Sequence, residues 1–326
     1  MKKILLLITS LCLFGLNAGA TEIPEGMGPL PTKVPVPADN LMTDAKIELG
    51  KTLYFETALS KSGQFSCNSC HNLGTWGVDN QKFSIGHKWQ RGGRNAPTTL
   101  NSAFWSKQFW DGRAPLLEDQ AKGPPLNPVE MGSLSDKKVV SRLTDAGYEP
   151  LFEEVFGKKS LTFDNMAKAI AAFERTLLTP NAPFDKFVRG EGDISSAAKR
   201  GMQKVADVGC ISCHSGPLFT SNEFVNFDYG TDTGVKSVTG KDDDDHLFRV
   251  QSWRNVAMTA PYFHDGSAET LEEAVQTMAK VQLGTTLSKK DVTDIIAFLE
   301  TLTGEAPQVT FPVLPRPSGH ALNWSD

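Results

Sequence analysis

The sequence predicts a mainly α-helical protein in which two similar domains follow each other, with long loops and little strand. Three observations support this fold class. Apolar residues recur at helical spacing in several segments, a short cysteine motif occurs twice, and other sequence blocks occur once in each half. The length of 326 residues is also long for a single hydrophobic core.

The first twenty residues have the features of a cleavable secretory signal. Lys2 and Lys3 precede an apolar core that is too short to span a bilayer, and Ala18-Gly19-Ala20 closes the segment. We therefore expect residues 1–20 to be a signal peptide, cleaved near Ala20, and the mature protein to lie in the periplasm. No later stretch is apolar enough to cross a membrane, so no membrane partner is expected.

The charge of the mature chain argues against nucleic-acid binding. Removal of the signal changes the formal net charge from −5 to −7, with 31 basic and 38 acidic residues. A mildly acidic protein lacks the basic surface that binds the phosphate backbone.

Once the signal peptide with Cys12 is removed, the mature chain has four cysteines, and they occur as two C-x-x-C-H motifs. These are Cys67-Asn68-Ser69-Cys70-His71 and Cys210-Ile211-Ser212-Cys213-His214. Four cysteines in an exported protein normally suggest two disulfides, but a disulfide needs no histidine, and a shared zinc site needs none beside each pair. In C-x-x-C-H the two thiols bond one porphyrin and the histidine ligates its iron. We therefore expect two covalently bound haem c groups.

A second repeat indicates that a cytochrome c-like haem domain is duplicated. Phe109 to Ala114 reads Phe-Trp-Asp-Gly-Arg-Ala, and Phe263 to Ala268 reads Phe-His-Asp-Gly-Ser-Ala. His264 thus takes the place of Trp110, and its expected role is structural. The predicted organisation is an N-terminal haem domain at 21–180, a C-terminal haem domain at 181–305 and a proline-rich arm at 306–326.

Helices are expected where the apolar spacing is helical, at Ala45 to Phe55, Phe163 to Leu178 and Val292 to Leu302. Thr162 and Ser288 have the residue types that begin helices.

Loops are expected between and around these helices. Phe219 to Asp245 is rich in Gly, Asp and Thr and predicts a long loop with short strands. The acidic run Asp242 to Asp245 within it is expected to be a solvated loop tip and matches no motif. The proline-punctuated segments 21–40 and 306–326 are expected to wrap the body.

Residue patterns leave the sixth iron ligands open. His87 lies in a glycine-bearing loop, where a ligand could move, but an ordinary surface histidine is also compatible. The second half offers Met202, Met258 and Met278. Met278 lies on the apolar face of a predicted helix, so both core packing and iron ligation fit its pattern.

Several blocks together resemble the bacterial di-haem cytochrome c peroxidases over essentially the whole mature chain. The combination is more specific than C-x-x-C-H alone. The matching blocks are the two haem motifs, Gly77 to Asn80, Ser84 to His87, Arg94 to Thr98, Gln108 to Arg113, Glu130-Met131 and Thr259 to His264.

The resemblance implies roles for the candidate ligands. His71 would be the proximal ligand of an N-terminal, peroxidatic haem, and His87 its distal ligand in the oxidised enzyme. His214 and Met278 would ligate a C-terminal haem that accepts electrons. Trp110 would lie between the two haems.

The resemblance also implies a peroxide pocket and a calcium site. Glu130 and Gln120 would line the pocket, where a carboxylate beside the iron can take a proton from one peroxide oxygen and deliver it to the other. Asn95, Thr259 and Pro261 would bind one calcium ion, the last two through backbone carbonyls, and such oxygen ligands suit calcium.

The expected function is reduction of hydrogen peroxide to water with electrons from a small soluble protein, either a c-type cytochrome or a copper protein. A homodimer is expected from the family. Related di-haem proteins instead oxidise tryptophans on a partner to mature a quinone cofactor, and Met278 and His87 argue against that alternative. A non-catalytic electron carrier is the other alternative, and it would leave Glu130 unexplained.

Overall fold

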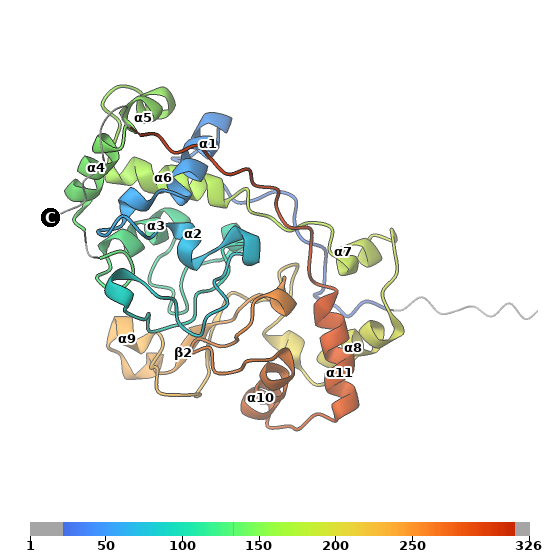
Figure 1. Cartoon of the computed structure of the whole chain (residues 1–326). Coiled ribbons are helices and arrows are strands. Elements are labelled where there is room, and N and C mark those ends of the chain that lie inside the picture. Colours follow the sequence, from blue (N-terminus) through green and yellow to red (C-terminus); the bar gives the residue numbers. More distant parts are fainter. Residues whose placement is uncertain (1–21, 133, 317–326) are drawn as a thin grey trace, which may run out of the picture.

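The computed structural model describes residues 22–132 and 134–316. Within these ranges the chain is mainly helical with little strand, which confirms that part of the predicted fold class. Figure 1 shows α1, α4, α5 and α6 grouped on one side and α7, α8 and α11 on the other, with long loops between them. The predicted signal peptide lies outside the described residues.

The helices and strands are short, and loops connect them. The α-helices are α1 Asp44–Tyr54, α2 Cys67–Cys70, α3 Leu117–Leu126, α4 Asp136–Asp145, α5 Glu149–Phe156, α6 Phe163–Glu174, α7 Pro183–Val188, α8 Ser196–Asp207, α9 Lys236–Thr239, α10 Leu271–Leu283 and α11 Lys289–Glu300. Short 3₁₀ turns are η1 Thr57–Leu59, η2 Leu73–Thr75, η3 His87–Trp89, η4 Ser102–Phe104, η5 Cys210–Ser212, η6 Asp242–Asp244 and η7 Val256–Met258. The strands β1 Phe224–Asn226 and β2 Leu247–Arg249 form an antiparallel pair.

The two predicted helix starts are confirmed. Thr162 accepts a hydrogen bond from the Asn165 amide, and Ser288 accepts one from the Asp291 amide. Helix α6 ends at Glu174, earlier than the expected Leu178. The chain there tightens into i→i+3 hydrogen bonds, such as the one from Thr176 to the Phe173 carbonyl.

The same helix crossing occurs in both halves of the chain. Helix α1 packs against α6, and α8 packs against α11. A Cβ at Gly50 of α1 would lie 1.9 Å from the Ala169 carbonyl oxygen, and a Cβ at Gly201 of α8 would lie 1.9 Å from the Asp294 carbonyl oxygen. Each crossing therefore requires glycine, and each first helix precedes one C-x-x-C-H motif. This shared packing feature lies outside the blocks that repeat in the sequence.

Two apolar clusters form the interior. One includes Tyr54, Phe152 and Phe173, and the other includes Phe184 and Phe298. The first cluster draws its buried members from residues 49–177 and the second from residues 184–302. The domain boundaries proposed from the sequence remain a prediction.

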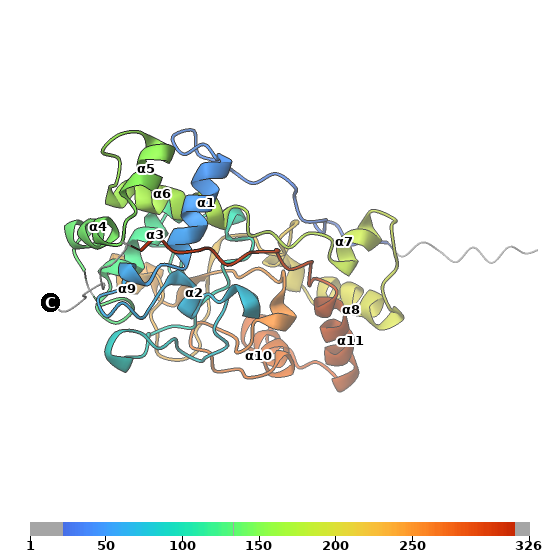
Figure 2. The ribbon, with the colours of Figure 1, turned by 45° about the horizontal axis from the view of Figure 1, so that its top comes forward.

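The described parts of the two arms lie against the body. The Leu30 amide donates to Asp185 at 3.2 Å, and Arg175 donates to the Pro35 carbonyl at 3.2 Å. At the other end, Arg316 pairs with the buried Glu56 at 2.8 Å. Figure 2 shows the final segment, in dark red, running from α11 back across α1.

The acidic run lies at the surface, as expected. Lys236 pairs with Asp242 at 2.9 Å and with Asp245 at 3.2 Å, and the Asp242 side chain is 96% exposed. Among the described residues, no helix is both long enough and apolar enough to span a membrane.

Candidate functional site

The repeated blocks around Trp110 and His264 form the same turn. Gln108 bridges to Ala114 in the first copy, and Tyr262 bridges to Ala268 in the second. The residue before the aromatic ring has a positive φ in both copies, 67° at Phe109 and 71° at Phe263. The two turns bring the rings of Trp110 and His264 edge to face, with 6.3 Å between centroids.

None of the four cysteines of the C-x-x-C-H motifs forms a disulfide. Cys67 and Cys70 begin and end α2, whereas Cys210 begins η5 and Cys213 follows it. Within the described ranges, no group of three or more His, Cys, Asp or Glu side chains is arranged to hold a metal ion.

Both motif histidines are held in the same way. The His71 Nδ1 lies 3.0 Å from the Pro97 carbonyl oxygen, and the His214 Nδ1 lies 3.2 Å from the Phe219 carbonyl oxygen. Such a bond fixes the tautomer and orients the ring, which leaves Nε2 to ligate a metal. Burial lowers the pKa of His71, and it lowers the pKa of His214 to about 4. The neutral imidazole, which is the ligating form, is thus favoured at both positions.

A large cavity lies beside the second motif. Its lining includes Cys210, Cys213, His214 and Met278, and its volume is about 250 Å³. That volume is far above the space that one or two buried waters need. Trp253 also lines it and stacks on His214 with 4.4 Å between ring centroids. Two thiols, an imidazole and a thioether around one largely apolar cavity fit a covalently bound haem.

Of the three candidate methionines, one lines this cavity and two do not. Met278, on α10, lines it. Met202 is fully buried in the second apolar cluster, and Met258 is 38% exposed at the surface. Periodicity left core packing and ligation equally open for Met278, whereas the fold places it with the second haem motif.

The residues expected between the haems and at the calcium site line this same cavity. They are Trp110, Asn95, Thr259 and Pro261. Asn95 connects them, because its carbonyl accepts a 2.9 Å hydrogen bond from the Trp110 indole and its amide donates to the His264 carbonyl at 2.7 Å. The Asn95 Nδ2 donates to the Gln81 carbonyl at 2.9 Å, which orients the side-chain amide.

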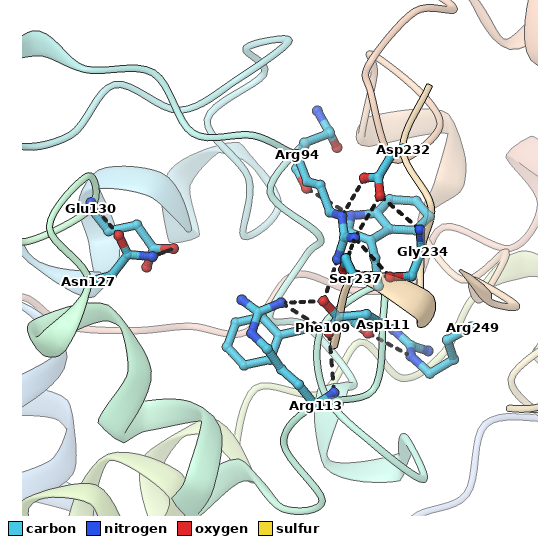
Figure 3. Close-up of polar contacts among 12 residues, drawn as sticks. Arg94, Phe109, Asp111, Arg113, Asn127, Glu130, Asp232, Gly234, Ser237 and Arg249 are labelled. Atoms are coloured by element: carbon cyan, nitrogen blue, oxygen red, sulfur yellow. Dashed lines mark hydrogen bonds and ion pairs between the residues drawn. The ribbon is translucent and has the colours of Figure 1, made fainter. Parts of the chain in front are cut away.

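Charged residues fix the segments around Trp110. Arg94 donates to Asp232 at 2.6 Å and also pairs with Asp111, and Arg113 pairs with Asp111 at 2.8 Å. Figure 3 shows this network, with Arg249 to one side and Glu130 at some distance on the other. The network joins the segment that carries Trp110 to the loop of the second half that carries Asp232.

Glu130 lines a second cavity together with Phe109, Arg113 and Asn127. The Asn127 side chain donates to the Glu130 carboxylate at 2.9 Å. Burial raises the pKa of Glu130, and the charge of Arg113 opposes this shift. Gln120, on α3, is not among the described residues that line this cavity.

His87 lies beside Glu130. Its amide donates to the Glu130 carbonyl at 2.9 Å, and its Nδ1 is buried without a hydrogen-bond partner among the described residues. Burial raises the pKa of the Cys70 thiol to about 11, and Glu130 lies close enough for its charge to add to this shift. The structure therefore brings the first haem motif, His87 and Glu130 into one region.

Gly86 packs closely against a neighbouring segment. A Cβ at this position would lie 2.2 Å from the Val129 carbonyl oxygen and 2.6 Å from the Glu130 carbonyl oxygen. Glycine is thus needed because the His87 loop packs directly on the segment that carries Glu130.

Comparison with known proteins agrees with this geometry. The family model described as di-haem cytochrome c peroxidase matches residues 44–193. The cytochrome c551 peroxidase of Nitrosomonas europaea is 43% identical over 92% of this chain and 90% of its own length. The cytochrome c551 peroxidase of Pseudomonas aeruginosa is 41% identical over 88% of this chain and 87% of its own.

The chain belongs to the di-haem cytochrome c peroxidase family. The resemblance stated from the sequence is therefore confirmed, and membership implies two haem c groups. A solved structure, of a MauG-like protein associated with microbial copper homeostasis, is also similar. Its TM-score is 0.77 at 28% identity, covering 87% of this chain and 95% of that one.

Sequence reasoning missed several residues that this family member uses to build the site. The carbonyl groups of Pro97 and Phe219, which hold the two histidines, gave no signal because any residue type carries a carbonyl. Asn127 could have been suspected from its place three residues before Glu130. Arg249, which lines the large cavity, stood out in no motif.

Proposed function

We propose that this protein reduces hydrogen peroxide to water in the periplasm, with electrons supplied singly by a small c-type cytochrome or a copper protein. The observation that carries the proposal is the grouping of Glu130, His87 and the first C-x-x-C-H motif. A carboxyl group with a raised pKa, placed beside a haem motif, suits proton transfer to and from peroxide. Relatives that share over two fifths of the sequence carry the name cytochrome c551 peroxidase.

The two motifs would hold different haems. Cys67 and Cys70 would attach the first, with His71 as proximal ligand and His87 as a removable distal ligand. The second would be attached by Cys210 and Cys213 and ligated by His214 and Met278. When bound, the haems supply two iron centres that together store the oxidising equivalents of one peroxide.

Glu130 is the proposed general acid–base group. Its carboxylate would take a proton from one peroxide oxygen and return it to the other as the leaving oxygen becomes water. Asn127 orients the carboxylate through its 2.9 Å hydrogen bond, and burial keeps the pKa raised. The role of Gln120 rests on the family resemblance alone.

Trp110 is the proposed connection between the two haems. Its indole is held by the Asn95 carbonyl, and its ring lines the cavity that contains the second haem motif. An aromatic ring fixed at this place would shorten the electron path toward the first motif.

Asn95, Thr259 and Pro261 are the proposed calcium ligands. All three line one cavity, and their oxygens are of the kind that calcium prefers. The homodimer remains a proposal that rests on the family.

Oxidation of tryptophans on a partner protein is the second candidate, favoured by the solved MauG-like structure with the same fold. Two positions in this chain argue for the peroxidase instead. His87 lies beside Glu130, and Met278 lines the cavity of the second motif. The resemblance to the tryptophan-oxidising group would imply a catalytic haem without the loop histidine and a second haem ligated by tyrosine, so neither His87 nor Met278 would be needed there.

Steady-state kinetics test the proposal. Purified holoenzyme should consume hydrogen peroxide when a reduced small c-type cytochrome or copper protein is supplied, and Glu130→Gln should slow it. Denatured protein should retain two haems by pyridine haemochrome. An enzyme with two bound haems that consumes no peroxide with either class of donor would be an electron carrier.

A further inference from the structure

Arg249 is a buried cation in the wall of the large cavity. It ends strand β2, is 1% exposed, and lines the cavity together with Cys210, Cys213 and His214. Its backbone amide donates to the Trp110 carbonyl at 2.9 Å, which fixes the strand against the segment that carries Trp110.

The partners of the Arg249 guanidinium are all neutral. One nitrogen, Nη2, donates to the Gln251 side chain at 3.1 Å, and Nε lies 3.5 Å from the Phe109 carbonyl. The guanidinium also lies over the Trp105 ring, 4.1 Å from its centroid. The remaining nitrogen, Nη1, is buried and has no hydrogen-bond partner among the described residues.

A neighbouring buried arginine, Arg254, has the carboxylate partner that Arg249 lacks among the described residues. Arg254 lines the same cavity and is 2% exposed, and it forms an ion pair of 2.6 Å with the buried Asp185. Arg249 forms no ion pair with any carboxylate in the part of the chain that the structure describes, and burial lowers its pKa to about 9. An unpaired buried charge is strongly unfavourable, so such groups are normally paired.

We propose that Arg249 binds a propionate carboxylate of the haem held by Cys210 and Cys213. The proposal rests on the proposed function in one respect, the presence of that haem. The cavity has an apolar lining with an unpaired guanidinium in its wall, and haem is an apolar ring that carries two carboxylates. The fork of a guanidinium matches a carboxylate, and Nη1 is the donor left free for it.

This assignment gives Arg249 a role as a positioning residue for electron entry. Gln251 accepts a hydrogen bond from Arg249 Nη2 and donates one to the Arg249 carbonyl at 3.1 Å, and both residues line the cavity that His214 also lines. A fixed positive charge in a dry site stabilises an added electron more strongly than a surface charge does. Arg249 therefore raises the potential of the C-terminal haem, which favours arrival of the donor's electron there.

The test compares three variants of the holoenzyme. Arg249→Gln removes the charge, Arg249→Lys keeps it, and Lys236→Gln removes a surface charge that pairs with Asp242 and Asp245. Haem content is measured first, by pyridine haemochrome. The midpoint potential of each haem then follows from spectroelectrochemical titration, and resonance Raman spectra report the bending mode of the haem propionates.

With two haems retained, Arg249→Gln should shift the one-electron reduction equilibrium of the C-terminal haem at least tenfold toward the oxidised form, which is about 59 mV. Its propionate band should move as well. Arg249→Lys should restore most of the potential, and Lys236→Gln should leave both unchanged.

An unchanged potential and Raman band in Arg249→Gln would make Arg249 a purely structural residue and overturn the proposal. A shift confined to the N-terminal haem would also overturn it, since Arg249 would then serve the other site. Absence of a second haem in the wild-type protein would contradict the proposed function, and this outcome is distinguishable from both.

Discussion

The indole nitrogen of Trp110 donates a 2.9 Å hydrogen bond to the carbonyl oxygen of Asn95. The Asn95 amide donates in turn to the carbonyl of His264, which takes the place of Trp110 in the second copy of the repeat. One residue thus holds both copies of the repeated turn. Because Asn95 is also a proposed calcium ligand, calcium binding and the position of Trp110 should be coupled.

Calcium removal should therefore reduce peroxide turnover. Treatment of the holoenzyme with a calcium chelator should lower turnover by roughly 5–150-fold, the usual range of coupling between two sites. Added Ca²⁺ should restore it, whereas Mg²⁺ should not, because Mg²⁺ demands a tighter octahedral shell. Elemental analysis should verify that the chelated protein is free of calcium. Unchanged turnover in that protein would show that calcium has no role in the reaction.

Met278→His should lower the potential of the C-terminal haem by on the order of 0.1 V or more, within the roughly 0.8 V that axial ligands span. Thioether ligation raises a haem potential relative to ligation by two histidines. Spectroelectrochemical titration measures the change. Met258→His is the matched control, since Met258 is exposed and lies outside the cavity lining. A change of the C-terminal haem potential in Met258→His but not in Met278→His would show that Met278 is not the ligand.

Glu130→Gln keeps the size of the side chain and its hydrogen bond from Asn127 but removes the ionisable group. General acid–base groups contribute roughly 10²–10⁴-fold, so peroxide turnover should fall by that factor while haem spectra stay native. Glu149→Gln, at the exposed start of α5, is the control and should retain turnover.

The pH profile gives a second readout of Glu130. Its pKa is raised above 4.5 by burial, so the carboxylate form is lost at a higher pH than for an ordinary glutamate. Wild-type kcat/KM should therefore fall as pH decreases through this raised pKa, and the same acid limb should be absent in Glu130→Gln. An identical acid limb in both proteins would assign it to another group.

His87→Gly should remove the need for pre-reduction before reaction with peroxide. With His71 and His87 both bound, the first iron has no free position, so oxidised wild-type enzyme should be nearly inert. The oxidised variant should be high-spin at the N-terminal haem in electron paramagnetic resonance spectra and should react directly. His246→Gly, beside the acidic run, is the control. Wild type that is already high-spin when oxidised would contradict the gating role.

The motifs that carry local chemistry could be predicted from the sequence. The two C-x-x-C-H motifs predict thioether attachment and ligation by His71 and His214 from five consecutive residues each, because that chemistry depends on spacing alone, and these roles stay predictions. The mainly helical fold and the helix starts at Thr162 and Ser288 could likewise be predicted from periodicity and capping.

Features that depend on contacts between distant segments could not be predicted. Met278 and Met202 share an apolar, helical pattern, and only the fold shows that one lines a cavity and the other lies in a core. The sequence indicated backbone freedom at Gly86, but the close packing of this glycine against the Val129 and Glu130 backbone could not be predicted. Arginine is usually a surface residue, so the sequence does not indicate that Arg249 is buried. Its burial without an anion follows from the fold, which places it against the Trp105 ring and the Phe109 carbonyl.

The most direct test of the central claim is the stoichiometry of turnover. Holoenzyme is mixed with excess reduced small c-type cytochrome and a limiting, known amount of hydrogen peroxide, and cytochrome oxidation is followed to completion by absorbance. Reduction of one peroxide to two waters takes two electrons, so the account predicts two cytochromes oxidised for each peroxide consumed. Loss of peroxide without cytochrome oxidation, or no loss of peroxide by enzyme that carries both haems, would contradict it.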